Sequence, residues 1–321
     1  MKITIIEYDV YDNKYNDEQI AILKSAAPNI IVDCLSSECV SKETLYDSDV
    51  IFGWPPSELL VDLPNLKWLH LPSAGSDSYN KASVFSNPDI IVTKSSGTFG
   101  IPISESIIGM MITLSRNFLP YYDNQKKNSW TQIRAEYPDI FNSTVFVLGL
   151  GNIGTELCKR LSGFDCNIIG FRNNPSTPCE YADEVLPVSE FRNRLPEADF
   201  IAICLPGTSE TKNLISFDEF KLMKSSAIIA NIGRGSIINT DALIDALNTN
   251  KIGGAGLDVT DPEPLPPDHP LWKAKNVLIT PHVSAASRHN KIRRLMIFAD
   301  LIKRYQNGQP LYNIVDFNKG Y

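Results

Sequence analysis

The stretch VFVLGLGNIGTELCKRL, residues 145–161, decides the fold. It begins with an apolar, β-branched run and passes through the glycine pattern GxGxxG into an amphipathic helical pattern. In this pattern Gly149 allows a tight turn, Gly151 lets a pyrophosphate approach the backbone, and Gly154 lets the helix pack closely on the strand. The helix N-terminus adds N–H donors and a positive dipole. The stretch therefore predicts the strand, turn and helix of a Rossmann dinucleotide-binding domain.

Further apolar runs extend this unit into a parallel sheet. They alternate with segments of helical pattern, and continuous apolar strands are typical of parallel sheets covered on both faces. The expected strands cover 144–150, 166–172, 198–206, 227–233, 253–259 and 276–282. The expected helices cover 152–163, 216–223, 240–249 and 290–306. Together they predict an α/β fold with a six-stranded, doubly wound sheet.

The first hundred residues predict a second α/β domain, with the alternation of a flavodoxin-like fold. Its expected strands cover 2–8, 29–34, 49–54, 66–71 and 89–94, with a helix over 17–27. The helix over 290–306 is expected to return to this domain. We therefore expect a discontinuous domain, residues 1–99 plus 284–321, into which the dinucleotide-binding domain, residues 100–283, is inserted. A long helix over 102–120 begins the inserted domain.

Composition and charge disfavour several classes of protein. The chain has 321 residues, 43% of them hydrophobic and 21% charged, which is enough apolar surface for a folded core. The chain has 30 Lys and Arg residues and 37 Asp and Glu residues, which gives a net charge of −7. Neither nucleic acid nor a membrane is therefore an expected partner. No apolar run approaches the roughly 18 residues that span a bilayer, and the N-terminus lacks the apolar segment of a signal peptide. We expect a cytoplasmic protein.

The cysteines indicate neither a metal site nor a disulfide framework. They form no CxxC pair and lie at no ligand spacing from a histidine, so we expect reduced thiols and no bound metal. Their positions are 34, 39, 158, 166, 179 and 204.

The end of the strand that follows the glycine loop predicts the choice of cofactor. A carboxylate there would bind the adenosine ribose and repel a 2′-phosphate, but this chain has Arg172. With Asn173, Asn174 and Ser176 as further donors, this arginine suits the 2′-phosphate of NADP(H). The alternative is a solvated arginine beside a site that also accepts NAD(H).

Three polar segments follow expected strands of the inserted domain. Arg234 lies in GRGS, Glu263 in DPEPLP and His282 in TPHVS. Ligands of doubly wound sheets bind at the carboxyl ends of the strands, so these side chains are expected at one edge. Each of them alone could be a cap, a solvated charge or a turn residue; together beside a glycine loop they indicate a catalytic site.

With these segments the chain resembles the D-isomer specific 2-hydroxyacid dehydrogenase family over nearly its whole length. The resemblance includes LPSAGSDSYN (71–80), TKSSGTFGIPISES (93–106) and YNIVDFNKGY (312–321) in the family's order. Within the family the chain is similar to NADP-preferring members of short chain length, such as glyoxylate/hydroxypyruvate reductases. The resemblance implies that the discontinuous domain binds the substrate. It also implies a homodimer built through the nucleotide-binding domains, with the 102–120 helix in the contact.

The resemblance implies the roles of the three polar residues, and their chemistry agrees with it. His282 would protonate the carbonyl oxygen of a 2-keto acid as hydride arrives, and would act as the base in oxidation. Glu263 would accept a hydrogen bond from the imidazole and keep it protonated. Arg234 would bind the substrate carboxylate and keto oxygen with its planar guanidinium.

The remaining contacts are expected on neighbouring loops. Backbone N–H groups of Ser73, Ala74 and Gly75 would bind the other side of the substrate carboxylate, and Trp54 is either a pocket wall or a core residue. Asp258 would either face the nicotinamide carboxamide or support the site. Besides the glycine loop and Arg172, the expected cofactor-binding residues are Asn152, Ile153, Asn173, Ser176, Leu205, Pro206, Thr211, Ile232, Gly233, Asp258, His282 and Ser284. Of the other histidines, His70 is expected in the core or a pocket wall, and His269 and His289 on the surface.

The sequence thus predicts an enzyme that reduces small 2-keto acids to (R)-2-hydroxy acids with NAD(P)H, preferring NADPH. A specific glyoxylate/hydroxypyruvate reductase is the alternative within this class. A nucleotide-sensing binding protein of the same fold is the alternative outside it, although we expect neither a basic patch nor a recruiting tail. A formate dehydrogenase is disfavoured, because the resemblance implies a Gln at this position in that branch of the family, whereas this chain has Glu263. A long phosphoglycerate dehydrogenase is disfavoured because we expect no regulatory domain after residue 321.

Overall fold

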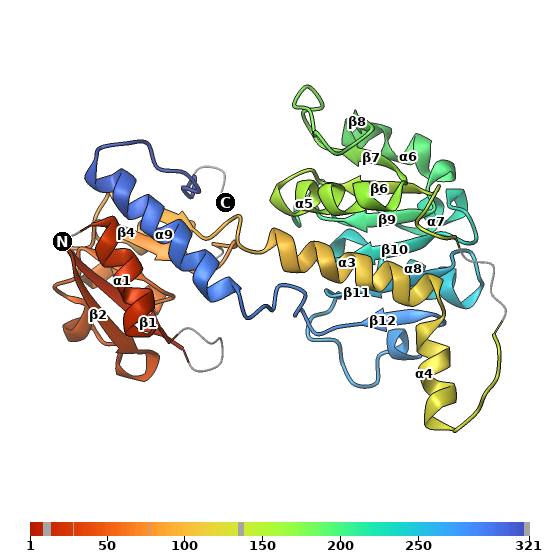
Figure 1. Cartoon of the computed structure of the whole chain (residues 1–321), viewed down its shortest axis with the longest axis horizontal. Helices are drawn as coiled ribbons and strands as arrows, with labels where there is room; N and C mark the ends of the chain where they lie inside the picture. Colours follow the sequence, from red (N-terminus) through yellow and green to blue (C-terminus); the bar gives the residue numbers. More distant parts are fainter. Residues whose placement is uncertain (9–13, 28, 77, 134–137, 318–321) are drawn as a thin grey trace. The chain divides into compact units, whose positions relative to one another are not determined.

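The computed structural model describes residues 1–8, 14–27, 29–76, 78–133 and 138–317 (Figure 1). The chain forms two compact units: unit 1 comprises Met1–Phe99 and Ser287–Tyr321, and unit 2 comprises Gly100–Ala286. Each unit contains a parallel sheet, as the predicted fold class requires. The second crossing comes after Ala286, so residues 284–286 belong to unit 2 and not to the discontinuous domain in which we expected them.

Unit 1 contains a five-stranded parallel sheet in the order β2-β1-β3-β4-β5. This order is that of flavodoxin-like folds, with the switch point between β1 and β3. The strands are β1 (Lys2–Glu7), β2 (Ile31–Ser36), β3 (Val50–Phe52), β4 (Trp68–Leu71) and β5 (Ile91–Lys94). Four of the five strands lie within the expected apolar runs, and β2 begins inside the run 29–34 but extends two residues beyond it, to Ser36.

Alternate strand residues of unit 1 are buried on opposite faces of the sheet, since successive side chains of a strand point to opposite sides. Ile5 and Ile6 of β1 belong to two different core clusters. Helices α1 (Asp17–Ala26) and α9 (Asn290–Gln306) pack on each other, and α9 contributes the fully buried Phe298 to the cluster of Ile5. The remaining helix of this unit, α2, is a single turn at Lys42–Leu45.

Unit 2 contains a seven-stranded parallel sheet in the order β12-β11-β10-β9-β6-β7-β8, the Rossmann order with one further strand (Figure 1). Six of the seven strands lie within the expected runs. The strands are β6 (Thr144–Leu148), β7 (Asn167–Phe171), β8 (Glu184–Leu186), β9 (Phe200–Ile203), β10 (Ile228–Asn231), β11 (Gly254–Leu257) and β12 (Val277–Ile279). The prediction of six strands is wrong, because β8 is a three-residue, half-buried edge strand that begins with a charged residue.

The first helical segment of unit 2 is broken where we expected one helix over 102–120. Helix α3 spans Gly100–Ser115 and α4 spans Phe118–Lys126, and Asn117 between them has φ of 57°, outside the helical region. A Cβ on Gly256 of β11 would lie 2.8 Å from Met110 Cβ, so this glycine lets α3 pack closely on the sheet. The other helices are α5 (Asn152–Leu161), α6 (Phe191–Arg194), α7 (Phe217–Leu222) and α8 (Thr240–Asn248).

In the described ranges, every helix is too short or too polar to cross a membrane. The same residues include no group of three or more His, Cys, Asp and Glu side chains that could hold a metal ion. All six cysteines are free thiols, and burial raises the pKa of the Cys204 thiol to about 12.

Candidate active site

The glycine loop joins the carboxyl end of β6 to the first turn of α5. Gly149 has φ of 97°, and a Cβ on it would lie 2.9 Å from Cys204 O. A Cβ on Gly154 would overlap Gly149 O, so the helix can pack this closely on the loop only because glycine stands there. A Cβ on Gly151, by contrast, would meet nothing within 4 Å. The loop therefore leaves its backbone open directly before Asn152, at the helix N-terminus, and this geometry fits a diphosphate.

Arg172 lies directly after β7, the neighbour of β6 in the sheet. Its Nη1 donates to Thr177 O at 3.3 Å, so the guanidinium bends over the loop that follows the strand. The side chains of Asn173 and Ser176 on this loop are exposed. Residues 172–179 include no carboxylate. The strand end therefore presents cationic and neutral donors, as a 2′-phosphate would require.

The loop after β9 carries three of the expected cofactor-binding residues. Leu205 is buried, Pro206 is exposed, and Thr211 Oγ1 donates to Pro206 O at 2.7 Å. The same hydroxyl accepts a hydrogen bond of 2.8 Å from Thr208 N. A Cβ on Gly233 would overlap Leu205 O, so the loops after β9 and β10 touch through their backbones.

Arg234 lies in a tight turn that Asn231, the last residue of β10, holds closed. The Asn231 amide accepts from Gly233 N at 3.0 Å and donates to Arg234 O at 2.9 Å. The asparagine is only 1% exposed, and Ile232 of the turn is also buried. Sequence analysis missed Asn231, because its contacts with the arginine turn leave no signal in the spacing of residues.

Two further glycines bring neighbouring loops against the arginine turn. A Cβ on Gly207 would lie 2.9 Å from Arg234 Cγ, so the exposed arginine lies along this glycine. A Cβ on Gly235 would overlap the carbonyl group of Thr260, in the loop after β11. The loop after β10 therefore contacts the loops after β9 and β11 at the carboxyl edge of the sheet.

The loops after β11 and β12 bring Glu263 and His282 together. His282 Nδ1 lies 2.7 Å from Glu263 Oε1, and the two side chains are 52% and 41% exposed. Since an ionised carboxylate only accepts, Nδ1 carries a proton and donates it. In the described part of the chain His282 Nε2 has no hydrogen-bond partner. That nitrogen is therefore open to a ligand.

Asp258 anchors the turn that carries His282. The residue is 2% exposed, and its carboxylate accepts from Thr280 Oγ1 at 2.6 Å, from Val283 N at 2.9 Å and from Ser284 N at 3.0 Å. Its backbone oxygen accepts from His282 N at 2.8 Å, and His282 has φ of 54°. These bonds hold the histidine in a left-handed conformation that few residues adopt unaided.

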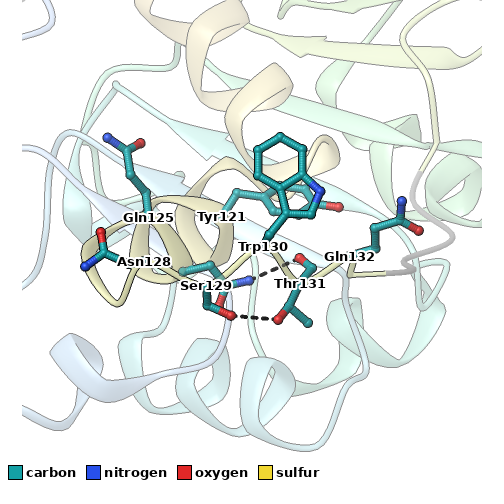
Figure 2. A pocket seen from close by; sticks show the side chains of 8 residues that line it. Tyr121, Gln125, Asn128, Ser129, Trp130, Thr131 and Gln132 are labelled. Atoms are coloured by element: carbon teal, nitrogen blue, oxygen red, sulfur yellow. Dashed lines mark hydrogen bonds between the residues drawn. The ribbon is translucent and has the colours of Figure 1, made fainter.

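A small pocket of about 260 Å³ adjoins the histidine and glutamate. Asp258, Leu265, Trp272 and Ile279 contribute to its lining. A larger pocket of about 710 Å³ lies elsewhere, between the end of α4 and the segment that follows it (Figure 2). None of the expected catalytic or cofactor-binding residues lines the larger pocket, so its size does not make it the site of the chemistry.

In unit 1, the expected substrate residues lie on loops after β3 and β4. Trp54 is half-buried, and its Nε1 donates to Ser73 Oγ at 3.1 Å. Ala74 and Gly75 are exposed. Within the described residues, the N–H groups of Ser73, Ala74 and Gly75 have no protein acceptor. They are therefore open to an anionic ligand.

The other three histidines have structural surroundings. His70 is fully buried in the core, which is one of its two expected places, and burial lowers its pKa to about 3. His289 is exposed, as predicted. His269 is half-buried, and its Nδ1 accepts from Leu271 N at 3.2 Å at the start of a short 3₁₀ helix.

Comparison with known proteins identifies the family. Residues 108–284 match the family model described as D-isomer specific 2-hydroxyacid dehydrogenase, NAD binding domain, which covers more than half of the chain. The chain belongs to this family. It is accordingly an NAD(P)-dependent D-2-hydroxyacid dehydrogenase, an oxidoreductase whose class interconverts 2-keto and 2-hydroxy acids.

Two relatives and two solved structures show the degree of sequence identity and structural similarity between this D-2-hydroxyacid dehydrogenase and other proteins. An uncharacterised protein from Corynebacterium melassecola is 35% identical over 87% of this chain and 92% of its own. A glyoxylate reductase from Thermofilum pendens is 31% identical over 72% of this chain and 69% of its own. A family member from Aeromonas salmonicida has a TM-score of 0.83 at 29% identity, covering 98% of this chain and 99% of its own. A probable 2-hydroxyacid dehydrogenase from Rhizobium etli, solved with NADP, HEPES and L(+)-tartaric acid, has a TM-score of 0.75 at 26% identity, covering 100% and 99%.

Proposed function

We propose that this dehydrogenase reduces small 2-keto acids to (R)-2-hydroxy acids with NADPH, and that His282 is the proton donor. The contact between His282 Nδ1 and Glu263 Oε1 carries the proposal. It orients the ring, fixes the proton on Nδ1, and leaves Nε2 to face a substrate oxygen. A histidine bonded in this way to a carboxylate is suited to general acid catalysis.

Glu263 and Arg234 have different tasks in this proposal. NADPH, when bound, supplies the hydride for the keto carbon. Glu263 stabilises the protonated imidazole of His282 by its negative charge. The histidine therefore carries the proton that the keto oxygen of the substrate receives when hydride is transferred. Arg234, whose turn is closed by Asn231, binds the substrate carboxylate and stabilises negative charge on the oxygen. The buried Asp258 keeps the histidine turn in place while the proton moves.

The preference for NADPH rests on Arg172. Its guanidinium stands where a carboxylate would repel a 2′-phosphate, and the similar R. etli protein was solved with NADP. We expect Arg172→Asp to lower kcat/KM with NADPH by about tenfold or more while leaving that with NADH nearly unchanged. Lys221→Asp, an equal change of charge on the exposed surface of α7, is the control. Equal loss with both cofactors, or none, would contradict this assignment.

A more specific function, reduction of glyoxylate or hydroxypyruvate, is the second candidate. The T. pendens relative that is 31% identical is named a glyoxylate reductase. This candidate predicts that the smallest 2-keto acids are by far the best substrates. It does not change the roles proposed for the residues above.

The test is steady-state reduction of glyoxylate, hydroxypyruvate, pyruvate, 2-ketoisocaproate and phenylpyruvate, each with NADPH and with NADH. Turnover of at least one acid, with a higher kcat/KM for NADPH, is the expected result. Binding of NADPH without turnover of any acid would overturn the proposal and favour a nucleotide-sensing protein.

We also propose that the enzyme is a homodimer built through unit 2. Large apolar side chains are exposed on and after α4: Phe118 at 52%, Tyr122 at 56% and Trp130 at 100%. Figure 2 shows Trp130 beside Tyr121, where the segment after α4 turns back along it. Exposed aromatic groups of this density are typical of a protein interface. Light scattering after size-exclusion chromatography tests it, and a monomer at micromolar concentration would contradict it.

A further inference from the structure

Aromatic side chains join three loops at the carboxyl edge of the unit 1 sheet. Tyr8 follows β1, Trp54 follows β3, and Ser73 follows β4. Since the strands are parallel, the loops after them meet at one edge of the sheet. The contacts among these three residues form a continuous chain from the first loop to the last.

The first contacts tie Trp54 to Tyr8. The Tyr8 hydroxyl donates to Trp54 O at 2.6 Å and accepts from Trp54 N at 3.1 Å. The two rings also meet edge to face, with centroids 5.2 Å apart. Burial raises the pKa of the Tyr8 phenol, so it stays protonated and keeps its donor across the physiological range. One side chain thus fixes both the backbone and the ring of the tryptophan.

The next contacts tie Trp54 to the loop of Ser73, Ala74 and Gly75. Trp54 Nε1 donates to Ser73 Oγ at 3.1 Å, and the Ser73 hydroxyl donates to Gly75 O at 2.7 Å. An indole N–H can only donate and a hydroxyl can do both, so the direction of the chain is fixed. The tryptophan therefore holds the serine rotamer, and the serine closes the turn that presents the open N–H groups.

We propose that Trp54 is a positioning residue for carboxylate recognition, and that Tyr8 in turn positions Trp54. This inference rests on the proposed binding of the substrate carboxylate by Ser73, Ala74 and Gly75. It implies that the residue expected to limit the size of the substrate side chain also holds the anion-binding turn. Selectivity for the side chain and affinity for the carboxylate are then coupled through one indole, whose ring limits the side chain and whose N–H holds the turn.

Trp54→Phe separates the two roles of the indole. Phenylalanine keeps an aromatic wall but has no N–H to donate to Ser73. The turn of Ser73, Ala74 and Gly75 therefore loses its hydrogen bond to residue 54. We expect the KM of every 2-keto acid to rise by a similar factor, about three- to tenfold for one lost hydrogen bond, with little change in kcat or in the KM for NADPH. A residue that is only a wall would instead change KM in proportion to the size of the substrate.

Two further variants test the chain of contacts. Ser73→Ala removes the acceptor and is expected to raise KM like Trp54→Phe, and the double variant should be no worse than either single one. Tyr8→Phe removes the hydroxyl but keeps the ring, and should raise KM by a smaller, equally uniform factor. Additive effects of Trp54→Phe and Ser73→Ala would overturn the proposal.

Matched controls distinguish this coupling from general loss of structure. Trp68→Phe removes an indole bond of the same kind, from Nε1 to Thr93 Oγ1 at 2.7 Å, but in the core of the same sheet. We expect it to lower the melting temperature without changing the KM of any 2-keto acid. Tyr46→Phe, at an exposed position, is the control for Tyr8→Phe. It should change neither the melting temperature nor the KM of any 2-keto acid.

The failure of this inference can be told apart from the failure of the proposed function. Calorimetric titration of oxamate, a small carboxylate, into the NADPH-saturated enzyme reads the affinity without turnover. If the wild type reduces 2-keto acids but Trp54→Phe leaves KM and oxamate affinity unchanged, or changes KM only for bulky acids, the inference alone is wrong. If the wild type neither reduces any acid nor binds oxamate, the proposed function is wrong.

Discussion

The two units carry two histidines whose surroundings are opposite. His70 of β4 is fully buried and stacks on Phe298, with ring centroids 4.8 Å apart. Its Nδ1 lies 2.7 Å from Thr93 Oγ1 and its Nε2 lies 3.0 Å from Ser95 Oγ. Because the Ser95 hydroxyl donates its proton to Leu71 O at 3.0 Å, it accepts from His70 Nε2, and Nδ1 of the neutral ring accepts from Thr93 Oγ1. Both ring nitrogens are satisfied in the neutral form, and burial lowers the pKa to about 3.

His282 of unit 2 is in the reverse situation. Its side chain is 52% exposed, and its partner is the carboxylate of Glu263 instead of a hydroxyl. One ring nitrogen is bonded, and the other has no partner in the described residues. The two histidines differ in burial and in the charge of the partner, and these two properties, not the residue type, determine which imidazole suits a structural role and which suits the proposed proton transfer.

Removing the exposed histidine is expected to have the largest effect. His282→Ala deletes the proposed acid, so kcat for 2-keto acid reduction should fall by about 10²- to 10⁴-fold. The glycine loop is untouched, so NADPH binding, followed by fluorescence titration, should stay within about twofold of wild type. Near-normal kcat would show that another group supplies the proton. The two histidines would then differ in burial and partner but not in a catalytic role.

The buried histidine should matter for stability and not for chemistry. Its folded pKa of about 3 lies below the ordinary 6.5, so between these values the unfolded chain binds a proton that the folded chain refuses. Acidification below pH 6.5 therefore favours unfolding, by roughly 2 kcal/mol at pH 5 from this group. His70→Gln keeps a hydrogen-bonding side chain but removes the titration. Urea unfolding at pH 7 and pH 5 should show a smaller loss on acidification in the variant, and an equal loss would refute the assignment.

The partner of the exposed histidine should have the smallest effect. Glu263→Gln keeps an acceptor for Nδ1 but removes the negative charge that stabilises the imidazolium. We expect about fivefold slower reduction at neutral pH. Steady-state reduction at saturating NADPH measures this loss, and an unchanged kcat would mean that the carboxylate does not assist the imidazole.

Most of the fold could be predicted because buried parallel strands are continuous apolar runs, such as residues 227–233 around β10. β8 escaped because a short edge strand buries too little apolar surface to leave this signature. The break at Asn117 escaped because apolar periodicity continues across it, while a single left-handed asparagine interrupts the backbone. Both misses concern positions where local geometry, and not the hydrophobic pattern, determines the structure.

The candidate site could be predicted only in part for a related reason. Arg234 and His282 could be predicted as candidates because polar and charged groups shortly after apolar strands stand out in a sequence. Asn231 and Gly207 were missed because each acts through contacts with the arginine turn that the spacing of residues does not reveal. The bond from Trp54 to Ser73 joins loops 19 residues apart, so no local pattern could have indicated it.

The discontinuity of unit 1 determines the order in which a ribosome can complete this protein. Unit 2 is one continuous stretch, Gly100–Ala286, whereas the core around β1 and β3 includes Leu295, Phe298 and Ile302 of α9. Domains fold as their residues leave the ribosome. The sheet of unit 1 is thus synthesised first but completed last. Its apolar face stays uncovered until α9 is synthesised, which happens only after the whole of unit 2.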